Sequence, residues 1–384
     1  MARSVLIVTP SLDRGGAERH STWLATTVDR TRWSPHVLAF AGGPLEAELV
    51  TAGVPVTVVS AGGLRGTRAA TAAVRAALDA VRPDLVTGQN IAVDLAVRPA
   101  LREHRVPYLV WKHTYGHIGY RGMRERLVEA VTGSLVTRYG AVCHTQVRYL
   151  VDELGLPPQK ISVVPNAVPV PEAAPAAPTG PPTVLMVAAM RADKGHALVL
   201  DAWSAVLAAV PGARLQLAGD GPCRSDLEAQ ARRLSIDGSV DFLGVRGDVA
   251  ALLASASLLV LASYAVECFP YAVLEAMAAG RGVVSTDVAG LPEMVDDGST
   301  GRLVPPDDPV ALAEGIVEGL TDDRAAAIRW GRAGWERAGQ VFPFHAWSRG
   351  MGDVFDKVAS AGPGVAGDPS EATRTPGRTR QEVS

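Results

Sequence analysis

The sequence predicts an α/β protein made of two doubly wound parallel sheets that face each other across a cleft. Short apolar runs alternate with helical patterns along most of the 384 residues, as they do in parallel βαβ units. This length is too great for one ordinary core and suits two domains. Residues 169–182, with six prolines in fourteen positions, predict a semi-extended linker between them.

Each predicted strand is a short apolar run that leads into a turn or a helical pattern. In the first half the strands are expected at Val5–Thr9, Ser34–Ala39, Pro55–Val59, Leu85–Thr87, Tyr108–Lys112, Ala141–Cys143 and Ile161–Val164. In the second half they are expected at Thr183–Ala188, Arg214–Ala218, Val240–Leu243, Leu258–Leu261 and Gly282–Ser285.

These strands and the linker divide the chain. We expect an N-terminal domain over residues 1–168, the linker over 169–182 and a C-terminal domain over 183–341. The aromatic segment that begins at Phe342 predicts a terminal helix, 342–361, that packs back on the domains. Residues 362–384 are rich in Gly, Pro, Ser, Thr and charge, and predict a disordered tail.

The composition is that of a soluble globular protein, with 47% hydrophobic and 20% charged residues. The net charge of −3 is uneven, because residues 1–168 hold 19 Lys and Arg against 13 Asp and Glu. That basic half suits an anionic acceptor or a lipid surface, or is an ordinary bias. We expect no nucleic-acid partner.

The cysteines and the apolar segments bear on the compartment. Three cysteines without a Cys-x-x-Cys argue against a disulfide framework or a zinc site. The run Ser4–Val8 is too short for a signal peptide. Residues 249–266 carry no charge for eighteen positions, but their serines and helix-then-strand pattern argue against a membrane span. We therefore expect a cytoplasmic protein.

Two glutamates carry the strongest functional signal. Glu267 follows the buried strand Leu258–Leu261, and Glu275 lies eight positions later in a helical run that ends at Gly280. Because open α/β sheets bind ligands at the carboxyl ends of their strands, this pair suits a ligand rich in hydroxyl groups. Each glutamate is equally compatible with a solvated helix residue.

Two strand-to-helix loops predict phosphate contacts. After the first strand, Gly15 and Gly16 allow a ligand to approach the backbone at a helix N-terminus, although most such turns are only turns. After the first strand of the second half come Arg191 and Lys194, two cations that suit a diphosphate or form a solvated basic loop. Gly219 lies in a third such loop, which lines a nucleobase pocket or is a plain turn.

Several motifs are weak or absent. His113 ends a strand on the cleft side, where a histidine is more often structural than catalytic, and Asn166 before the linker suits a hinge. The chain has no Asp-x-Asp, Walker A motif, Gly-x-Ser-x-Gly or His-Glu-x-x-His. A bound diphosphate would therefore be neutralised by Arg191, Lys194 and backbone amides, without a metal or another cofactor.

Taken together, the motifs resemble the family 4 retaining glycosyltransferases, which have the GT-B fold. The resemblance covers about residues 4–350 and is strongest at the two glutamates and the Glu-Ala-Met-Ala-Ala-Gly run that follows. It also rests on these segments: Gly15-Gly-Ala-Glu-Arg, Val164-Pro-Asn-Ala-Val, Lys194-Gly-His, Gly219-Asp-Gly-Pro, Phe242-Leu-Gly, Gly290-Leu-Pro-Glu and Asp297-Gly-Ser-Thr-Gly.

The resemblance implies a role for each site residue. Glu267 and the segment with Cys268 and Phe269 would bind the donor sugar, and Glu275 the ribose. Lys194 and Arg191 would hold the diphosphate, with Gly15 and Gly16 closing on it and Gly219 and Leu274 also in the donor site. His113 would lie near the reacting sugar, so the catalytic set is Glu267, His113 and Lys194. Cys143-His144-Thr145 departs from the family pattern on the acceptor side.

The implied reaction is the transfer of a sugar from a nucleotide-diphosphate donor to a hydroxyl group, with a UDP-sugar favoured and a GDP-sugar possible. The acceptor is a small molecule, a glycan or a lipid-linked molecule, and peripheral membrane contact stays open. The alternative is a nucleotide-sugar epimerase on the same fold, and a non-catalytic binding protein is the third reading.

Overall fold

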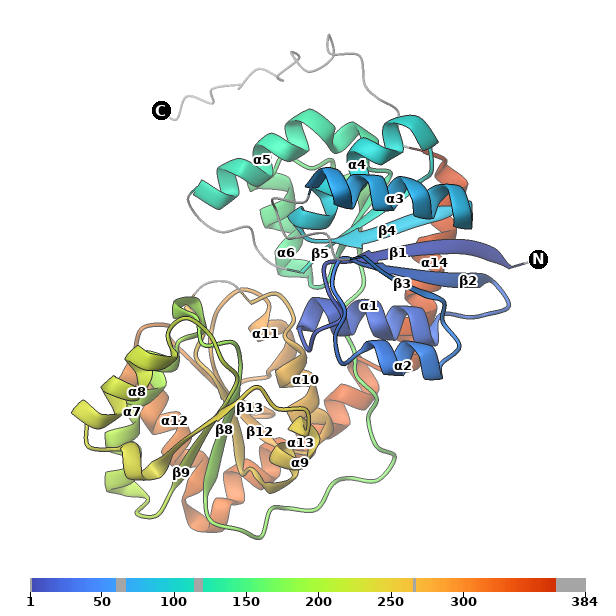
Figure 1. Cartoon of the computed structure of the whole chain (residues 1–384). Coiled ribbons are helices and arrows are strands. Elements are labelled where there is room, and N and C mark those ends of the chain that lie inside the picture. Colours follow the sequence, from blue (N-terminus) through green and yellow to red (C-terminus); the bar gives the residue numbers. More distant parts are fainter. Residues whose placement is uncertain (1, 60–66, 114–119, 265–266, 364–384) are drawn as a thin grey trace, which may run out of the picture.

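A computed structural model describes residues 2–59, 67–113, 120–264 and 267–363. Its elements form two units, each a twisted parallel sheet with helices on both faces (Figure 1). The predicted tail falls almost wholly on residues 364–384, which lie outside the described residues.

The first unit holds a seven-stranded sheet with the order β3-β2-β1-β4-β5-β6-β7, and every pairing in it is parallel. Its strands are β1 (Arg3–Thr9), β2 (Trp33–Ala39), β3 (Val56–Val58), β4 (Leu85–Gln89), β5 (Tyr108–Lys112), β6 (Arg138–Ala141) and β7 (Ile161–Val163). Its helices are α1 (Gly16–Thr27), α2 (Glu46–Thr51), α3 (Thr67–Val81), α4 (Ile91–His104), α5 (Tyr120–Thr132) and α6 (His144–Arg148).

The second unit holds a six-stranded parallel sheet with the order β10-β9-β8-β11-β12-β13. Its strands are β8 (Thr183–Val187), β9 (Arg214–Ala218), β10 (Val240–Gly244), β11 (Leu258–Leu261), β12 (Gly282–Thr286) and β13 (Gly301–Val304). The helices are α7 (His196–Ala209), α8 (Arg224–Arg233), α9 (Val249–Ser255), α10 (Tyr271–Ala278), α11 (Leu291–Met294), α12 (Pro309–Leu320), α13 (Ala325–Val341) and α14 (Phe344–Ala361).

The predicted doubly wound α/β class is confirmed, and two strand predictions need correction. β13 was not predicted. Gly301–Val304 is a four-residue edge strand in which only the first and last residues are buried. It therefore lacks the continuous apolar run of a central strand. The strand predicted at Ala141–Cys143 begins earlier, at Arg138. Arg138 and Tyr139 interrupt the apolar pattern, so the sequence did not indicate the start of this strand. Tyr139 is nevertheless buried, and its hydroxyl group donates a hydrogen bond to Glu129.

Helix α14 leaves the second unit and packs on the first, as its place behind that sheet indicates (Figure 1). Its apolar face buries Trp347, Met351 and Phe355. Asp356 is the polar anchor, since it pairs with Arg3 and Arg32 and accepts a hydrogen bond of 3.2 Å from Trp33 Nε1. The chain therefore crosses between the units twice, through the linker and through α14.

We expect Asp356→Ala to lower the free energy of unfolding by about 2–3 kcal/mol, because Arg3 and the buried indole N–H of Trp33 lose this acceptor and Arg32 is left with the exposed Asp353. Urea denaturation followed by tryptophan fluorescence measures it. Asp353→Ala is the matched control, since that carboxylate is largely exposed and bonds only Arg32, at 3.0 Å. Its expected cost is below about 1 kcal/mol, and equal costs for the two variants would contradict the anchoring role.

Candidate functional site

Three of the predicted site residues lie in loops at the carboxyl edge of the second sheet. The loop after β8 carries Arg191 and Lys194, and the loop after β11 carries Glu267. β8 and β11 are neighbours, and from them the strand order runs outward in opposite directions. This is the switch point at which open α/β sheets bind ligands, because the loops on its two sides diverge and leave a crevice.

Lys194 and Glu267 form an ion pair in that crevice. Glu267 is 5% exposed, and its Oε1 also accepts a hydrogen bond of 2.7 Å from Ser263 Oγ. Gly195 makes this geometry possible: its φ is 72°, and a β-carbon there would come within 1.8 Å of the Ala262 carbonyl oxygen. The lysine is thus held beside the glutamate by close packing of one loop on the end of β11.

Arg191 is placed differently from Lys194. Its Nε donates to Asp193 Oδ1 at 2.8 Å, and this salt bridge raises the pKa of Arg191 and lowers that of Asp193. The guanidinium is 45% exposed. An anion in the crevice must therefore draw Arg191 away from Asp193, whereas Lys194 already points at the buried carboxylate.

Glu275 lies half-buried on α10, and among the described residues its carboxylate has no hydrogen-bond partner. Burial raises its pKa to about 7, and the attraction of Arg19 opposes that rise. Arg19 belongs to α1 of the first unit, where it also pairs with Glu48. Near neutral pH the carboxylate is therefore part-protonated and ready to accept hydrogen bonds from a ligand.

The predicted glycine loop of the first unit starts α1, with Gly15 as the N-cap. Glu18 folds back over it, so that a β-carbon at Gly15 would lie 2.1 Å from Glu18 Oε2. Burial raises the pKa of this carboxyl group, and nearby Asp13 adds to the rise. Any phosphate that binds at this helix N-terminus must first displace Glu18.

Arg14, in the same loop, was not predicted as a site residue. Its guanidinium lies against Gly247 of the second unit, where a β-carbon would come within 2.8 Å of Cζ. The side chain is exposed and has no carboxylate partner within the ranges that the structure describes. Arg14 is thus a cation that spans the two units, and only the fold places it there.

His113 has a neutral imidazole at ordinary pH, because burial lowers its pKa to about 4. Its ring meets that of His20 edge-on with centroids 4.5 Å apart, and its Nε2 is buried without a partner in the described part of the chain. Burial and the neighbouring His113 likewise hold the pKa of His20 well below its usual value.

A buried hydrogen-bonded cluster of His20, Asn166 and Tyr271 joins the two units. Tyr271 Oη donates to Asn166 Oδ1 at 3.2 Å, and His20 Nδ1 lies 3.3 Å from the same hydroxyl. Asn166 Nδ2 donates to the Phe269 carbonyl oxygen at 2.8 Å. Asn166, predicted only as a possible hinge residue, therefore holds the segment that carries Cys268 and Phe269.

A second contact joins the two units at the Cys143-His144-Thr145 segment. Glu293 on α11 accepts hydrogen bonds from the backbone N–H groups of His144, at 2.9 Å, and Thr145, at 2.6 Å. It thereby caps the first turn of α6 from the other unit. Beside it, a β-carbon at Gly290 would lie 1.6 Å from the Cys268 carbonyl oxygen and 3.0 Å from Cys143 Sγ. The Cys143-His144-Thr145 segment is thus an interface between the units.

The remaining predicted residues are packed. Gly219 has a φ of 147°, and a β-carbon there would lie 1.9 Å from the Ala188 carbonyl oxygen. Cys268 and Phe269 are buried, and Phe269 packs on Phe342 with ring centroids 5.1 Å apart. Leu274 is fully buried in the core of α10, so its part in donor binding stays a prediction.

The described residues hold neither a metal-binding cluster nor a membrane-spanning helix. Across residues 2–59, 67–113, 120–264 and 267–363, no group of three or more His, Cys, Asp and Glu side chains is arranged to hold a metal ion. Within the same ranges no helix combines the length and apolar character needed to cross a bilayer.

Two family models match the chain. "Glycosyltransferase Family 4" covers residues 14–171, and "Glycosyl transferases group 1" covers residues 181–322. The glycogen synthase of Mycobacterium tuberculosis is 30% identical over 286 residues, which are 71% of this chain and 69% of that protein. These matches identify a glycosyltransferase, and they give no support to the epimerase alternative.

Two further comparisons add detail. An exopolysaccharide phosphotransferase of Streptomyces coelicolor is 35% identical over 177 residues, but the match spans 46% of this chain and only 19% of that protein. The crystal structure of Anabaena HepE in complex with UDP-glucose aligns with a TM-score of 0.81 at 21% identity, over 92% of this chain and all of that one. The fold is therefore the GT-B fold.

Glu275 makes the stability of the protein depend on pH. A carboxyl group whose pKa rises from 4.5 to about 7 on folding stabilises the fold while it is protonated. That contribution is complete below pH 4.5 and is lost as the pH rises through 7. Glu275→Gln should therefore be more stable than the wild type by up to about 3 kcal/mol at pH 8, and equally stable at pH 4.

Urea unfolding curves at a series of pH values measure this difference. Glu314→Gln, a change on the outer helix α12, is the control that removes one carboxylate away from the crevice. A difference between wild type and Glu275→Gln that does not change with pH would contradict the raised pKa.

Proposed function

This chain belongs to glycosyltransferase family 4, and we propose that it transfers a sugar with retention from a nucleotide-diphosphate donor, without a metal ion. The observation that carries the proposal is the Lys194–Glu267 pair at the switch point between β8 and β11. It places a cation and a buried carboxylate side by side in the crevice where a ligand would enter.

The proposed leaving group is the diphosphate, whose charge grows as the sugar–oxygen bond breaks. Lys194 is the cation held beside Glu267, where the sugar is proposed to bind. Stabilisation of the negative charge on the leaving diphosphate, in a site that excludes water, is the main source of catalysis. Arg14 supports the proposal because it reaches from the first unit to Gly247 and has no carboxylate partner in the described residues. These cations replace the metal that an Asp-x-Asp motif would hold.

Glu267 is proposed to bind the hydroxyl groups of the transferred sugar. In the free protein it bonds Lys194 and Ser263. Both of these donors reach Oε1. When a diphosphate draws Lys194 away, Oε1 loses one of the two donors and can accept a bond from the sugar, while the carboxylate supports the positive charge that develops at the anomeric carbon. His113 is neutral at pH 7, because burial lowers its pKa to about 4, and it suits a hydrogen bond to the sugar rather than a charge contact.

Glu275 is proposed to accept hydrogen bonds from the ribose hydroxyls. Such bonds favour the carboxylate over the acid, so binding should lower a pKa that stands at about 7 in the free protein. We favour a UDP-sugar donor, since the structural neighbour HepE holds UDP-glucose. A GDP-sugar is the alternative, and no described residue distinguishes the two bases.

A thermal-shift screen with UDP, UDP-glucose, GDP and GDP-mannose in EDTA tests the donor and the metal. We expect a uridine nucleotide to raise the melting temperature, because a ligand at 100 times its Kd stabilises by about 2.7 kcal/mol. Lys194→Ala should lose most of this shift and slow transfer about 10²-fold. Lys357→Ala, which removes an exposed lysine from α14, is the control. An equal shift and turnover in Lys194→Ala would overturn the proposal.

Products of the donor alone separate the remaining alternatives. NMR of UDP-glucose incubated without acceptor should show slow hydrolysis that releases α-glucose first, as retention requires. Release of β-glucose would contradict retention, and an epimerised nucleotide sugar would favour the epimerase.

We further propose that the acceptor is presented at a membrane surface. The reason is helix α5, whose acidic side chains are buried or half-buried and whose outward apolar side chains are exposed. Its acidic residues face inward, where Glu125 and Glu129 each accept a 2.8 Å bond from Lys112. Its outer face exposes Met123, Leu127 and Val131 by 67%, 64% and 62%. Residues four apart share one face of a helix, so these three form an apolar ridge suited to a lipid interface.

Cosedimentation with phosphatidylcholine vesicles, with and without phosphatidylglycerol, tests the ridge. We expect binding that increases with the anionic lipid and falls at least about tenfold in Leu127→Ser, since burial of one leucine contributes about 1.5–3 kcal/mol. Val310→Ser is the control, because Val310 is 65% exposed on α12 of the other unit. Wild-type protein that stays with the supernatant would point to a small soluble acceptor or a glycan.

A further inference from the structure

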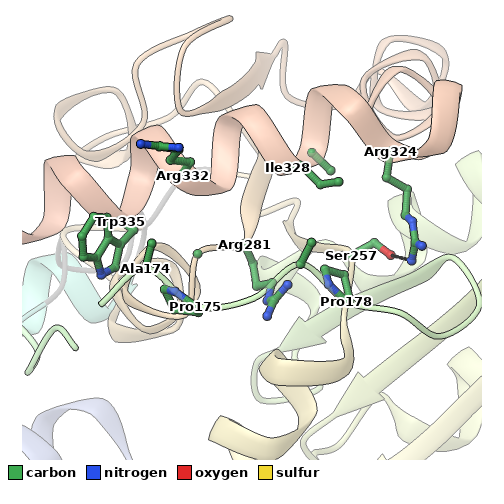
Figure 2. Close-up of a pocket in the computed structure, with 12 residues that line it drawn as sticks. Ala174, Pro175, Pro178, Ser257, Arg281, Arg324, Ile328, Arg332 and Trp335 are labelled. Carbon is green, nitrogen blue, oxygen red and sulfur yellow. Dashed lines mark hydrogen bonds between the residues drawn. The ribbon is translucent and has the colours of Figure 1, made fainter. Parts of the chain in front are cut away.

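A cavity of about 210 Å³ lies beneath the second sheet, between the proline-rich linker and α13. Ser257 and Arg281 precede β11 and β12, so the cavity is at the amino ends of these strands. The Lys194–Glu267 pair lies at their carboxyl ends, roughly 13 Å away along a four-residue strand. Figure 2 shows the lining residues, which are Ala174, Pro175, Ala177, Pro178, Ser257, Gly280, Arg281, Arg324, Ala327, Ile328, Arg332 and Trp335.

Arg281 is the unusual member of this lining. It is 3% exposed, and its Nη2 donates to the Ala176 carbonyl oxygen of the linker at 2.8 Å. Its Nε and Nη1 are buried, and neither finds a partner within the described residues. A buried guanidinium without a counter-charge is costly, and here burial lowers its pKa. The buried positive charge of Arg281 therefore lacks a counter-charge among the described residues, and an anion in the cavity would supply one.

A second arginine adds to the charge. Arg324 Nη1 donates to the Gly180 carbonyl oxygen at 3.0 Å and lies 3.5 Å from Ser257 Oγ (Figure 2). Arg332 stands at the rim, mostly exposed, with its Nε 3.4 Å from Glu336. No Asp or Glu appears among the described residues that line the cavity. Its lining is thus cationic at one end.

The rest of the lining is apolar. Ile328 and Trp335 come from α13, and Pro175 and Pro178 come from the linker (Figure 2). The indole of Trp335 is fixed, because its Nε1 donates to the Pro171 carbonyl oxygen at 3.0 Å. A ligand that suits both parts has a compact anionic head and a small body that packs on flat, apolar surfaces.

We propose that this cavity binds a small phosphate ester, with the phosphate on Arg281, Arg324 and the Ser257 hydroxyl and the organic body against Ile328 and Trp335. The phosphate supplies the counter-charge that the buried guanidinium of Arg281 lacks among the described residues, and so offsets the cost of its burial. Since Arg281, Arg324 and Trp335 also hold three linker carbonyls, occupancy tightens the linker on the second unit.

Thermal shift with inorganic phosphate, glycerol 3-phosphate and glucose 1-phosphate tests the site, with glycerol, glucose and sodium chloride of matched ionic strength as controls. All measurements use full-length Lys194→Ala protein, so that binding in the donor crevice contributes little. We expect the phosphate esters to raise the melting temperature by several degrees, and glycerol, glucose and salt to leave it unchanged. Hydrogen exchange of amides between Glu172 and Gly180 should slow at least about tenfold when an ester binds.

Two variants close the site in different ways. Arg281→Met removes the charge but keeps the bulk, so it should abolish the shift while its own melting temperature stays equal or rises. Ala177→Phe fills the cavity and leaves every arginine in place, which keeps the test valid if Arg281→Met fails to fold. Arg329→Gln is the matched control, since Arg329 is exposed on α13 outside the lining.

The proposal is overturned if the esters produce no shift, if sodium chloride reproduces it, or if Arg281→Met and Ala177→Phe respond as the Lys194→Ala parent does. A shift with inorganic phosphate alone, equal to that with the esters, would restrict the site to a free phosphate ion.

Discussion

The hydrogen bonds of the Asn166 side-chain amide fix how the first unit is placed against the second. It lies at the end of the first unit, 3% exposed, and bonds both the Tyr271 hydroxyl and the Phe269 carbonyl oxygen of the second. Buried polar groups need their partners, so these bonds hold the loop after β11 against the segment that follows β7. Glu293 makes a similar contact on the other side, where it caps α6. The loop after β11 is therefore positioned in part by the opposite unit.

The charges in this molecule are left incomplete at the two places where a ligand is proposed. Around Arg98 the pattern is the reverse, since this fully buried guanidinium bonds both Glu129 and Asp94. Glu275 and Arg281, in contrast, are buried or half-buried without a neutralising partner in the described residues. A ligand at each of the two proposed sites would supply the missing partner.

The sequence predicted the strands well where a strand is central, because burial on both faces requires a continuous apolar run such as Leu258–Leu261. It failed at the edge strand β13, which is half-buried and carries Arg302. It also predicted Lys194 and Glu267 for one crevice, since both follow neighbouring strands. It missed Arg14 and Ser263, because neither stands in a distinctive motif and each acts through a contact with a distant segment.

The sequence by itself determined the fold class, the family and the short-range geometry of the crevice, because apolar periodicity and glycine loops act over a few residues. Gly195 illustrates this, since its positive φ places Lys194 at the end of β11. Only the tertiary structure decided which charges are neutralised. Arg191 is paired with Asp193, whereas Arg14 lies against Gly247. Glu18 covers Gly15, and Arg281 is buried without a counter-charge in the described residues. Burial and pairing arise from segments far apart in the chain, and no local pattern encodes them.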